Sequence, residues 1–310
     1  MADSVLKLED FARLFGTSVD EISLECRQLI SQYDFSYRPL TEKDRDRVLL
    51  DVLKRIESDQ FSLAGKEGKD RWEKGWAENR DGFLKSSGDS DQLIPKYIRP
   101  GQFVRIDQQY ATTVDPNFEF NWYKVFRLWL FQTYLSGADT VYEFGCGSGF
   151  NLAALAKLYP DKKYYGLDWA QASVDIANEL GRIHGWDIQG KLFDFFDPDR
   201  TMDLEKNSVV LTIGALEQTG TDYGEFIEFL FESSPKLCIH IEPIVEWYDE
   251  NNLVDYAGIR FLQKRKYWSG FPEQIEELER KGQVEIIKKK RSYFGSLYVE
   301  GYSQLIWRPI

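Results

Sequence analysis

The chain has few cysteines, no long apolar run and fewer basic than acidic residues. Cys26, Cys146 and Cys238 are odd in number and lie far apart, which argues against a disulfide framework or a metal cluster and is typical of a reducing compartment. No stretch approaches the roughly 20 apolar residues of a membrane span, and the first residues lack the apolar core of a secretory signal. We therefore expect a cytoplasmic protein with no membrane partner and no bound metal.

The shortage of basic residues bears on the choice of partner. The chain has 51 Asp and Glu against 39 Lys and Arg, a formal net charge of -12. Nucleic-acid affinity comes mainly from cations on phosphates, so no nucleic-acid partner is expected. Ala12, Gly16 and Ile22 match the spacing of a helix-turn-helix, but residues 1–60 hold nine Lys and Arg against 13 Asp and Glu. We expect this segment to be a helical cap or a dimerisation element.

The most informative stretch is Val141–Phe150, with the sequence VYEFGCGSGF, followed by Asp168 at the end of the next apolar run. Glycines lack a Cβ atom, so the backbone can turn tightly and approach a ligand closely. The helix that starts behind them offers free N–H groups and a partial positive charge. An acid at the tip of the next strand can accept both hydroxyls of a ribose. The pattern predicts a nucleoside-binding βαβ unit.

Two details of this stretch argue against NAD as the ligand. The dinucleotide fingerprint has its third glycine three positions after the second, but Phe150 occupies that position and Gly149 comes one place too early. Glu143, two residues before the first glycine, would repel a pyrophosphate and suits a ligand with an ammonium and a sulfonium. An NAD-dependent oxidoreductase is therefore the weaker interpretation.

The pattern E-x-G-x-G-x-G, with an acid about twenty residues downstream, resembles motif I and the following acidic position of class I (Rossmann-like) S-adenosylmethionine (SAM)-dependent methyltransferases. From Asp139 onward, strand-like and helix-like segments alternate, as in a doubly wound α/β fold. The resemblance implies a seven-stranded, mostly parallel sheet that ends in an antiparallel hairpin. The strands are expected at residues 140–144, 163–167, 190–193, 208–213, 237–241, 284–292 and 298–307, the last two joined by a short turn at 294–296.

The residues before the glycine-rich stretch are expected to form a separate unit. Residues 1–120 are predicted to be an N-terminal helical extension or lid, and residues 121–310 the methyltransferase domain. Ser18 and Glu21 form a capping box in front of one amphipathic helix, and Thr41 can cap a second.

The resemblance implies SAM as the cofactor. Its methionine end would lie over the loop that starts at Phe144, with Glu143 near its ammonium, while Asp168 would hold the ribose and Asp194 the adenine amino group. Trp169 either stacks on the adenine or belongs to the core, and Cys146 is expected to be a small filler. The cofactor-binding residues so implied are Glu143, Phe144, Gly145, Cys146, Gly147, Asp168, Trp169, Asp194, Phe195 and Ala215.

The candidate catalytic residues follow the fourth and fifth strands. Glu217 lies in the loop after the fourth strand, and His240 and Glu242 share one face at the end of the fifth. A buried, unpaired carboxylate would be very unfavourable, so each Glu belongs either to a polar active site or to a structural pair. Glu242 is our first choice for a general base, followed by His240 and Glu217. A hydrogen-bonded core histidine is an equally good interpretation of His240.

These residues predict methyl transfer from SAM to an oxygen or nitrogen of a small polar metabolite, such as a sugar or a nucleotide-linked sugar. A catalytically silent SAM- or nucleoside-binding partner subunit is the main alternative, and a homodimer is compatible with either. The acceptor site is expected to use cations and aromatic residues before the first strand, namely Tyr97, Arg99, Arg105, Tyr110 and Trp122.

Overall fold

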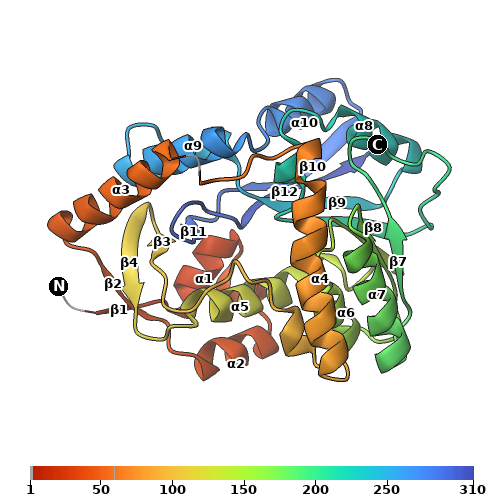
Figure 1. Ribbon diagram of the computed structural model, residues 1–310, viewed down its shortest axis with the longest axis horizontal. Helices are drawn as coiled ribbons and strands as arrows, with labels where there is room; N and C mark the ends of the chain where they lie inside the picture. The colour runs from red at the N-terminus through yellow and green to blue at the C-terminus, as the bar shows by residue number, and fades with distance from the viewer. Residues whose placement is uncertain (1–2, 59) are drawn as a thin grey trace.

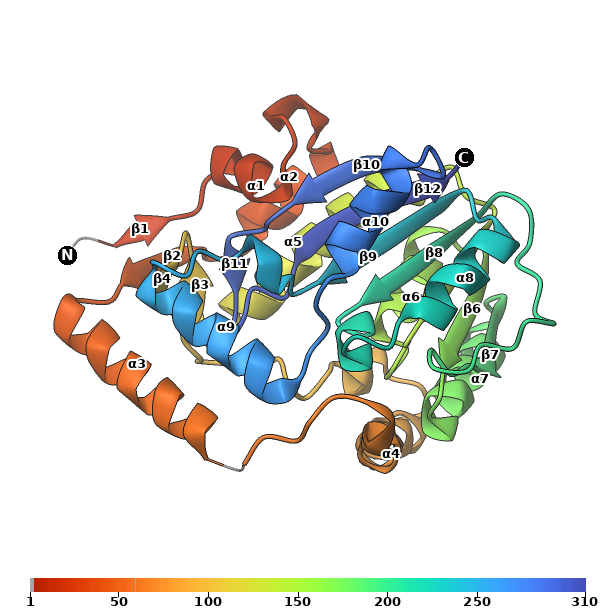
Figure 2. The same ribbon diagram turned by 90° about the horizontal axis from the view of Figure 1, so that it is seen from above.

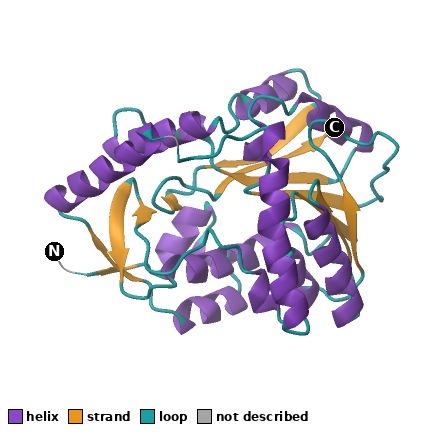
Figure 3. Ribbon diagram, in the orientation of Figure 1, coloured by secondary structure: helices purple, strands orange, loops and turns teal. Residues whose placement is uncertain are grey.

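The computed structural model describes residues 3–58 and 60–310. Its larger sheet has seven strands in the order β10-β12-β9-β8-β5-β6-β7, with helices on both faces (Figures 1 and 3). The predicted doubly wound, mostly parallel sheet is confirmed. Its parallel strands are β5 (Thr140–Phe144), β6 (Lys163–Asp168), β7 (Ile188–Leu192), β8 (Ser208–Ile213) and β9 (Leu237–Glu242).

Apolar side chains alternate between the two faces of this sheet and meet a different set of helices on each. Val141, Val209 and Ile239 pack against one set, whereas Val210 and Cys238 pack against the other. The central strands are therefore buried on both faces, which explains their nearly continuous apolar sequences. The first set is α5 (Phe118–Tyr134), α6 (Phe150–Leu158) and α7 (Gln171–His184), and the second is α8 (Gly224–Ser233) and α10 (Phe271–Arg280).

The sheet ends in the expected antiparallel pair, β10 (Val284–Lys290) and β12 (Ser303–Pro309). The predicted short turn at 294–296 and the predicted start of the last strand are wrong. Phe294 and Gly295 instead form β11, which pairs with a strand of a second sheet. Burial of the Phe294 ring against Trp122, with centroids 4.0 Å apart, favours this longer excursion over a tight hairpin.

The second sheet is the main feature of the N-terminal part that the sequence did not predict. It has five strands in the order β1-β2-β4-β3-β11. Its strands are short, and their pattern is too brief to separate from loop. They are β1 (Ser4–Val5), β2 (Ser36–Pro39), β3 (Val104–Ile106), β4 (Gln109–Thr113) and β11 (Phe294–Gly295).

The expected helices accompany this sheet, and both predicted caps are present. Thr41 Oγ1 accepts from the backbone N–H of Asp44 at 3.2 Å, and the capping box of Ser18 and Glu21 opens a short 3-10 turn. The α-helices outside the larger sheet's two layers are α1 (Leu8–Phe15), α2 (Leu24–Gln32), α3 (Glu42–Glu57), α4 (Lys69–Lys85) and α9 (Leu253–Arg265). The 3-10 turns are η1 (Val19–Glu21), η2 (Lys66–Gly68), η3 (Ser90–Leu93), η4 (Leu216–Thr219) and η5 (Val245–Trp247).

The N-terminal part shares its core with the larger sheet. Phe15 of α1 stacks on Trp129 of α5 with centroids 4.9 Å apart, and one continuous apolar cluster extends from Leu6 to Ile306. The segment that resembled a helix-turn-helix thus packs its apolar side on α5. A division at residue 120 stays a prediction, and α5 itself begins at Phe118.

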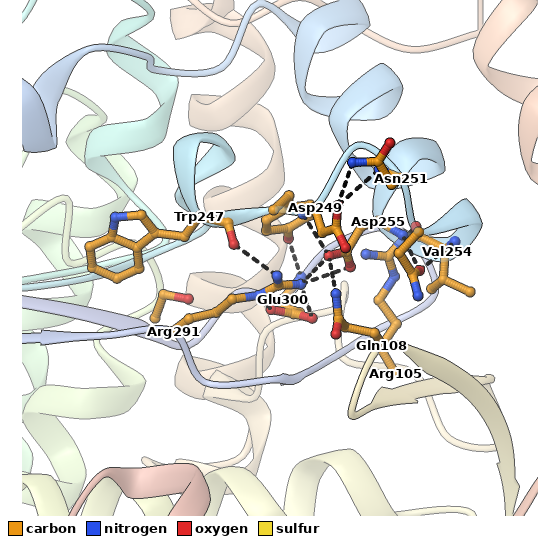
Figure 4. A network of polar contacts seen from close by, with 12 residues as sticks. Arg105, Gln108, Trp247, Asp249, Asn251, Val254, Asp255, Arg291 and Glu300 are labelled. Atoms are coloured by element: carbon orange, nitrogen blue, oxygen red, sulfur yellow. Dashed lines mark hydrogen bonds and ion pairs between the residues drawn. The ribbon is translucent and has the colours of Figure 1, made fainter.

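A buried ionic network joins the second sheet to the C-terminal part (Figure 4). Arg291 Nη2 donates to Asp255 Oδ2 at 2.6 Å, and its Nε donates to Glu300 Oε2 at 2.7 Å. Arg105 of β3 is fully buried beside them and donates to the carbonyl of Val254. Arg105 therefore helps to hold the architecture together, and its expected role at an acceptor site stays a prediction.

The carboxyl ends of β5, β6, β8 and β9 meet at one edge of the larger sheet, and α4 lies close to this edge beside α7 in both views (Figures 1 and 2). Glu73 of α4 accepts from the backbone N–H of Ala172 at 3.1 Å, and Arg80 pairs with Asp175 at 3.0 Å. The carboxylate of Glu73 thus interacts with the positive end of the α7 dipole. These contacts fix α4 over the edge where α/β proteins bind ligands.

The close contact between β7 and α7 generates a stability prediction. A Cβ added to Gly190 would lie 2.3 Å from the carbonyl oxygen of Val174, whereas one added to Gly224 would have no atom within 4 Å. We expect Gly190→Ala to lower the free energy of unfolding by about 1–3 kcal/mol, because backbone must move. Gly224→Ala, the control, should cause no loss. Urea denaturation measures both, and equal stability of the two variants would contradict the packing described.

Candidate cofactor site

A cavity opens at the carboxyl edge of the larger sheet, which is the edge where α/β proteins bind small molecules. Loops after β5, β6, β7 and β8 supply most of its wall, and α4 supplies two tryptophans. The lining residues are Trp72, Trp76, Gly145, Asp168, Trp169, Phe195, Phe196, Gly214, Ala215, Gln218 and Thr219. The structure therefore brings together five of the ten predicted cofactor residues around one cavity.

Two glycines of the β5–α6 loop are required by close approach as well as by backbone conformation. Gly145 has φ 71° and Gly147 has φ 52°, both in the left-handed region. A Cβ on Gly145 would lie 2.3 Å from Ala215 Cβ, and one on Gly147 would lie 2.8 Å from Trp76 Cζ2. The loop thus forms a narrow cradle between the β8 loop and the α4 helix.

Asp168 organises this cradle from the tip of β6. Its Oδ2 accepts from the N–H of Gly147 and its Oδ1 from the N–H of Ala170, both at 2.9 Å. Burial raises its pKa to about 6. Each carboxylate oxygen keeps a further lone pair, and the residue lines the cavity, so Asp168 can still accept hydroxyl groups of a ligand.

Glu143 is the most unusual polar group of the site. It is 2% exposed, and its Oε1 accepts from Asn151 Nδ2 at 2.8 Å. Its Oε2 is buried and has no hydrogen-bond partner among the described residues. Burial raises its pKa to about 8. A buried acceptor without a partner is unfavourable, which marks this oxygen as a place for a donor or cation supplied by a ligand.

Two residues of α5 that the sequence analysis missed bind Asn151, which in turn donates to Glu143. Tyr123 donates its hydroxyl proton to Asn151 Oδ1 at 2.6 Å, and Arg127 Nη1 donates to the same oxygen at 3.2 Å. The positive charge of Arg127 acts to lower the pKa of Glu143. The sequence signal that could have revealed this cluster is Arg127, an arginine on an otherwise apolar and aromatic helix face. The cluster presents a carboxylate and a guanidinium close together, as an amino-acid zwitterion requires.

The side of the cavity beyond Asp168 is aromatic. Trp169 and Phe196 have ring centroids 5.8 Å apart, and Phe195 lines the wall beside them. Asp194 Oδ1 accepts from the N–H of Phe196 at 3.0 Å and is absent from the cavity lining given above. Asp194 thus caps the turn that carries the aromatic wall, and a contact with adenine stays a prediction.

Two of the predicted cofactor residues direct their side chains into the core. Phe144 is fully buried and meets Phe193 at 4.6 Å between centroids. Cys146 is buried beside Gly166, and burial raises the pKa of its thiol. Only their backbone can face a ligand, so Cys146 is a filler as expected.

The helix α4 closes the cavity with two tryptophans that the sequence analysis did not place in the site. Trp72 and Trp76 stack with centroids 5.5 Å apart and planes at 16°. Both line the cavity. The two tryptophans are four residues apart on a helix otherwise rich in charged residues, so they share one face. This spacing could have indicated that the helix packs this face against a cavity.

The predicted base Glu242 holds the β8 loop. It is fully buried, its Oε1 accepts from the N–H groups of Ala215 and Leu216 at 3.1 Å, and its Oε2 accepts from that of Glu217 at 3.4 Å. Burial and the charge of Glu217 raise its pKa to about 8, and burial raises the pKa of Glu217 to about 7. Two carboxyls this close favour sharing one proton. Glu217 precedes Gln218, which lines the cavity.

His240 lies in the core beneath this pair. Its Nδ1 is 2.9 Å from Thr212 Oγ1, and its ring packs between Phe271 and Trp307. Burial lowers its pKa to about 3, so the ring is neutral near pH 7. These contacts are those of a hydrogen-bonded core histidine, the second of the two interpretations that the sequence allowed.

Among residues 3–58 and 60–310, no group of three or more His, Cys, Asp or Glu side chains is arranged to hold a metal ion. Within the same ranges, no helix has the length and apolar character needed to cross a membrane.

Several solved structures are similar to part of this chain. No protein-family model and no curated protein matches the chain. A crystal structure of the small RNA methyltransferase HEN1 is 21% identical over 58% of this chain and 24% of that chain, with a TM-score of 0.42. This chain thus spans about a quarter of the HEN1 chain. A SAM-dependent methyltransferase from Aquifex aeolicus is 16% identical over 58% of this chain and 86% of that chain, with a TM-score of 0.38.

One similar structure is named for a different activity. The cyclase SpnF is 14% identical over 61% of this chain and 82% of that chain, with a TM-score of 0.43. Several of the similar structures are named as methyltransferases. At identities of 21% or less and TM-scores of 0.43 or less, these likenesses carry no argument about activity or substrate.

Proposed function

We propose that this protein binds SAM and transfers its methyl group to an oxygen or nitrogen of a small polar metabolite. The observation that carries the proposal is Glu143, whose buried and unpartnered Oε2 lies next to the glycine cradle. An ammonium placed there would give this oxygen its partner. A pyrophosphate would meet a buried carboxylate instead, which disfavours NAD.

The remaining residues fit the other parts of SAM. Asp168 lines the cavity with free lone pairs for the ribose hydroxyls, and the aromatic wall around Trp169 and Phe195 suits an adenine. Arg127 and Tyr123 stand beside Glu143 for the methionine carboxylate. When bound, SAM supplies a methyl group already activated by the sulfonium. The protein must then align the acceptor and exclude water, and Trp72 and Trp76 are placed for the second task.

Of the predicted bases, Glu242 has its oxygens occupied by backbone N–H groups and acts on the reaction through the η4 turn. Glu217, whose neighbour Gln218 lines the cavity, is therefore the candidate general base. A silent binding subunit remains the alternative, since the residues that support binding do not by themselves require turnover.

The direct test is calorimetric titration with SAM, S-adenosylhomocysteine and NADH in parallel. We expect the first two to bind with micromolar affinity and NADH not to bind. Asp168→Asn should weaken both by about tenfold or more, because hydrogen bonds to a charged acceptor are lost. The exposed Asp161→Asn serves as control. Binding of NADH alone would overturn the proposal.

Glu143→Gln should have two effects: it should stabilise the free protein and weaken SAM binding. The pKa of Glu143 is raised from 4.5 to about 8, so between these values the unfolded chain ionises while the folded protein does not. Wild-type stability therefore falls relative to the variant as pH rises from 5 to 8, by roughly 3–4 kcal/mol. Urea unfolding at both pH values measures this difference. SAM affinity should fall about tenfold.

The control for this prediction is Glu250→Gln, an exposed carboxyl. It should change neither the pH dependence nor the affinity. If Glu143→Gln gave the same pH profile as wild type, Glu143 would not be a desolvated group.

The tryptophans of α4 give a further prediction. Trp76→Ala should weaken SAM binding about tenfold, because an aromatic wall of the cavity is lost. Binding should also change tryptophan fluorescence less than in wild type. Trp186→Ala removes a tryptophan that stacks on His184 with centroids 4.4 Å apart, outside the cavity lining, and should leave affinity unchanged. Equal affinity of Trp76→Ala and wild type would show that α4 does not close on the ligand.

A further inference from the structure

Two arginines lie beside the cavity wall that α4 and the η4 turn form. The guanidinium carbon of Arg71 lies 5.1 Å from the ring centroid of Trp72, which lines the cavity. Arg71 Nη1 donates to the carbonyl of Leu63 at 3.5 Å. The next residue, Ala64, donates its backbone N–H to the carbonyl of Arg265 at 2.8 Å. The segment before α4 thus joins Arg71 to the last residue of α9.

Gln218 connects these arginines to the cavity. It lines the cavity and is 9% exposed, and its backbone carbonyl accepts from the N–H of Gly65, the residue after Ala64, at 2.8 Å. Its Nε2 donates to Glu217 Oε1 at 2.9 Å. Its Oε1 is buried and has no hydrogen-bond partner among the described residues. The cavity wall therefore presents an acceptor for a ligand donor directly beside Glu217.

Neither arginine forms an ion pair within residues 3–58 and 60–310. In the same ranges, Arg71 Nη2 and Arg265 Nε are buried without a hydrogen-bond acceptor. Arg71 is also the third residue of α4, where the helix dipole is positive. Buried guanidinium N–H groups without acceptors are unfavourable, which marks these nitrogens as donors for an anionic group of a ligand.

Aromatic rings orient both guanidinium groups. Arg265 lies over the ring of Tyr267, with its guanidinium carbon 4.9 Å from the centroid, much as Arg71 lies over Trp72. A stacked guanidinium keeps its planar edge of N–H groups for a carboxylate or a phosphate. Both side chains are only partly buried, so an anion from solvent can reach them.

The electrostatic balance at this place also favours an anion. The charge of Arg265 acts to lower the pKa of Glu217, and it acts together with burial to lower the pKa of Arg71. Glu217 and Glu242 favour sharing one proton. One negative charge therefore faces two positive charges, and the local field attracts anions even though the whole chain is acidic.

We infer that Arg71, Arg265 and Gln218 form the acceptor site and that the acceptor is a small metabolite with an oxyanion group, either a carboxylate or a phosphate. The inference rests on the proposed function and narrows the class of its acceptor. The two arginines bind the oxyanion. Gln218 Oε1 accepts a hydrogen bond from the hydroxyl or amine of the same molecule, which places that group beside Glu217, the candidate general base.

The test uses two matched pairs of probes, benzoate with benzamide and phenyl phosphate with phenol. Each is titrated by calorimetry, at pH 7.5 and constant ionic strength, into the full-length protein saturated with S-adenosylhomocysteine. We expect at least one anion to bind about tenfold more tightly than its neutral partner, because hydrogen bonds between charged groups are the stronger ones. The pair that shows this ratio distinguishes a carboxylate from a phosphate. Arg71→Gln and Arg265→Gln should each lower the ratio about threefold, and the double variant should lower it to about one.

Arg260→Gln is the matched control, because it removes the same charge from the same helix. Arg260 is exposed and donates to Gln263 Oε1 at 3.1 Å, so this variant should keep the wild-type ratio. Arg71→Lys keeps the charge but loses the planar edge of donors, and its ratio should lie between those of the wild type and Arg71→Gln. Unchanged binding of S-adenosylhomocysteine shows that each variant is folded.

The outcomes separate this inference from the proposed function. Absence of S-adenosylhomocysteine binding to the wild type contradicts the proposed function. Binding of S-adenosylhomocysteine without any preference for the anions, or with a preference that survives in the double variant, contradicts the acceptor site alone.

Discussion

The structure depends on a desolvated carboxyl at the tip of its central strand. Glu143 is the last but one residue of β5, with one oxygen held by Asn151 and the other without a partner among the described residues. Folding places this group where its charge is disfavoured, and such an arrangement persists only when the surroundings determine it firmly. Here the surroundings are α5, on one side of Glu143, and the glycine cradle of the β5–α6 loop, which follows it in the chain. The unfavourable burial in the free protein is what a ligand cation would relieve.

The same constraint explains why loops far apart in sequence fit together so closely. Gly145 touches Ala215 and Gly147 touches Trp76, so the β5, β8 and α4 segments share one cradle. Glu242 holds the β8 loop from inside the protein, and Asp168 holds the β5 loop. Asp168 and Glu242 therefore serve here as acceptors for backbone N–H groups. Burial raises their pKa values, although these hydrogen bonds act in the opposite direction.

Much of the larger sheet could be predicted because its signals are local. Strands β5 and β8 were placed at their observed residues, since continuous apolar runs bounded by turn residues are distinctive. The second sheet could not be predicted, because β11 is only Phe294–Gly295 and pairs with residues nearly 190 positions away. Its position depends on tertiary burial of aromatic rings, which overrides local turn preference.

The site shows the same division. The glycines and Asp168 carry a sequence pattern, whereas Trp76 and Arg71 lie on a helix where spacing alone suggests an ordinary face. His240 and Glu242 sat at the expected strand end, but whether such groups face a ligand or the backbone depends on the neighbouring turn.

The most direct test of this account is the number of protons released when SAM binds at pH 7, measured by calorimetry in buffers of different ionisation enthalpy. The pKa of Glu143 is about 8 in the free protein, so the carboxyl is mostly protonated and must ionise to face an ammonium. The account predicts release of close to one proton, about 0.5–1. Tight binding of SAM with no proton exchange would contradict it.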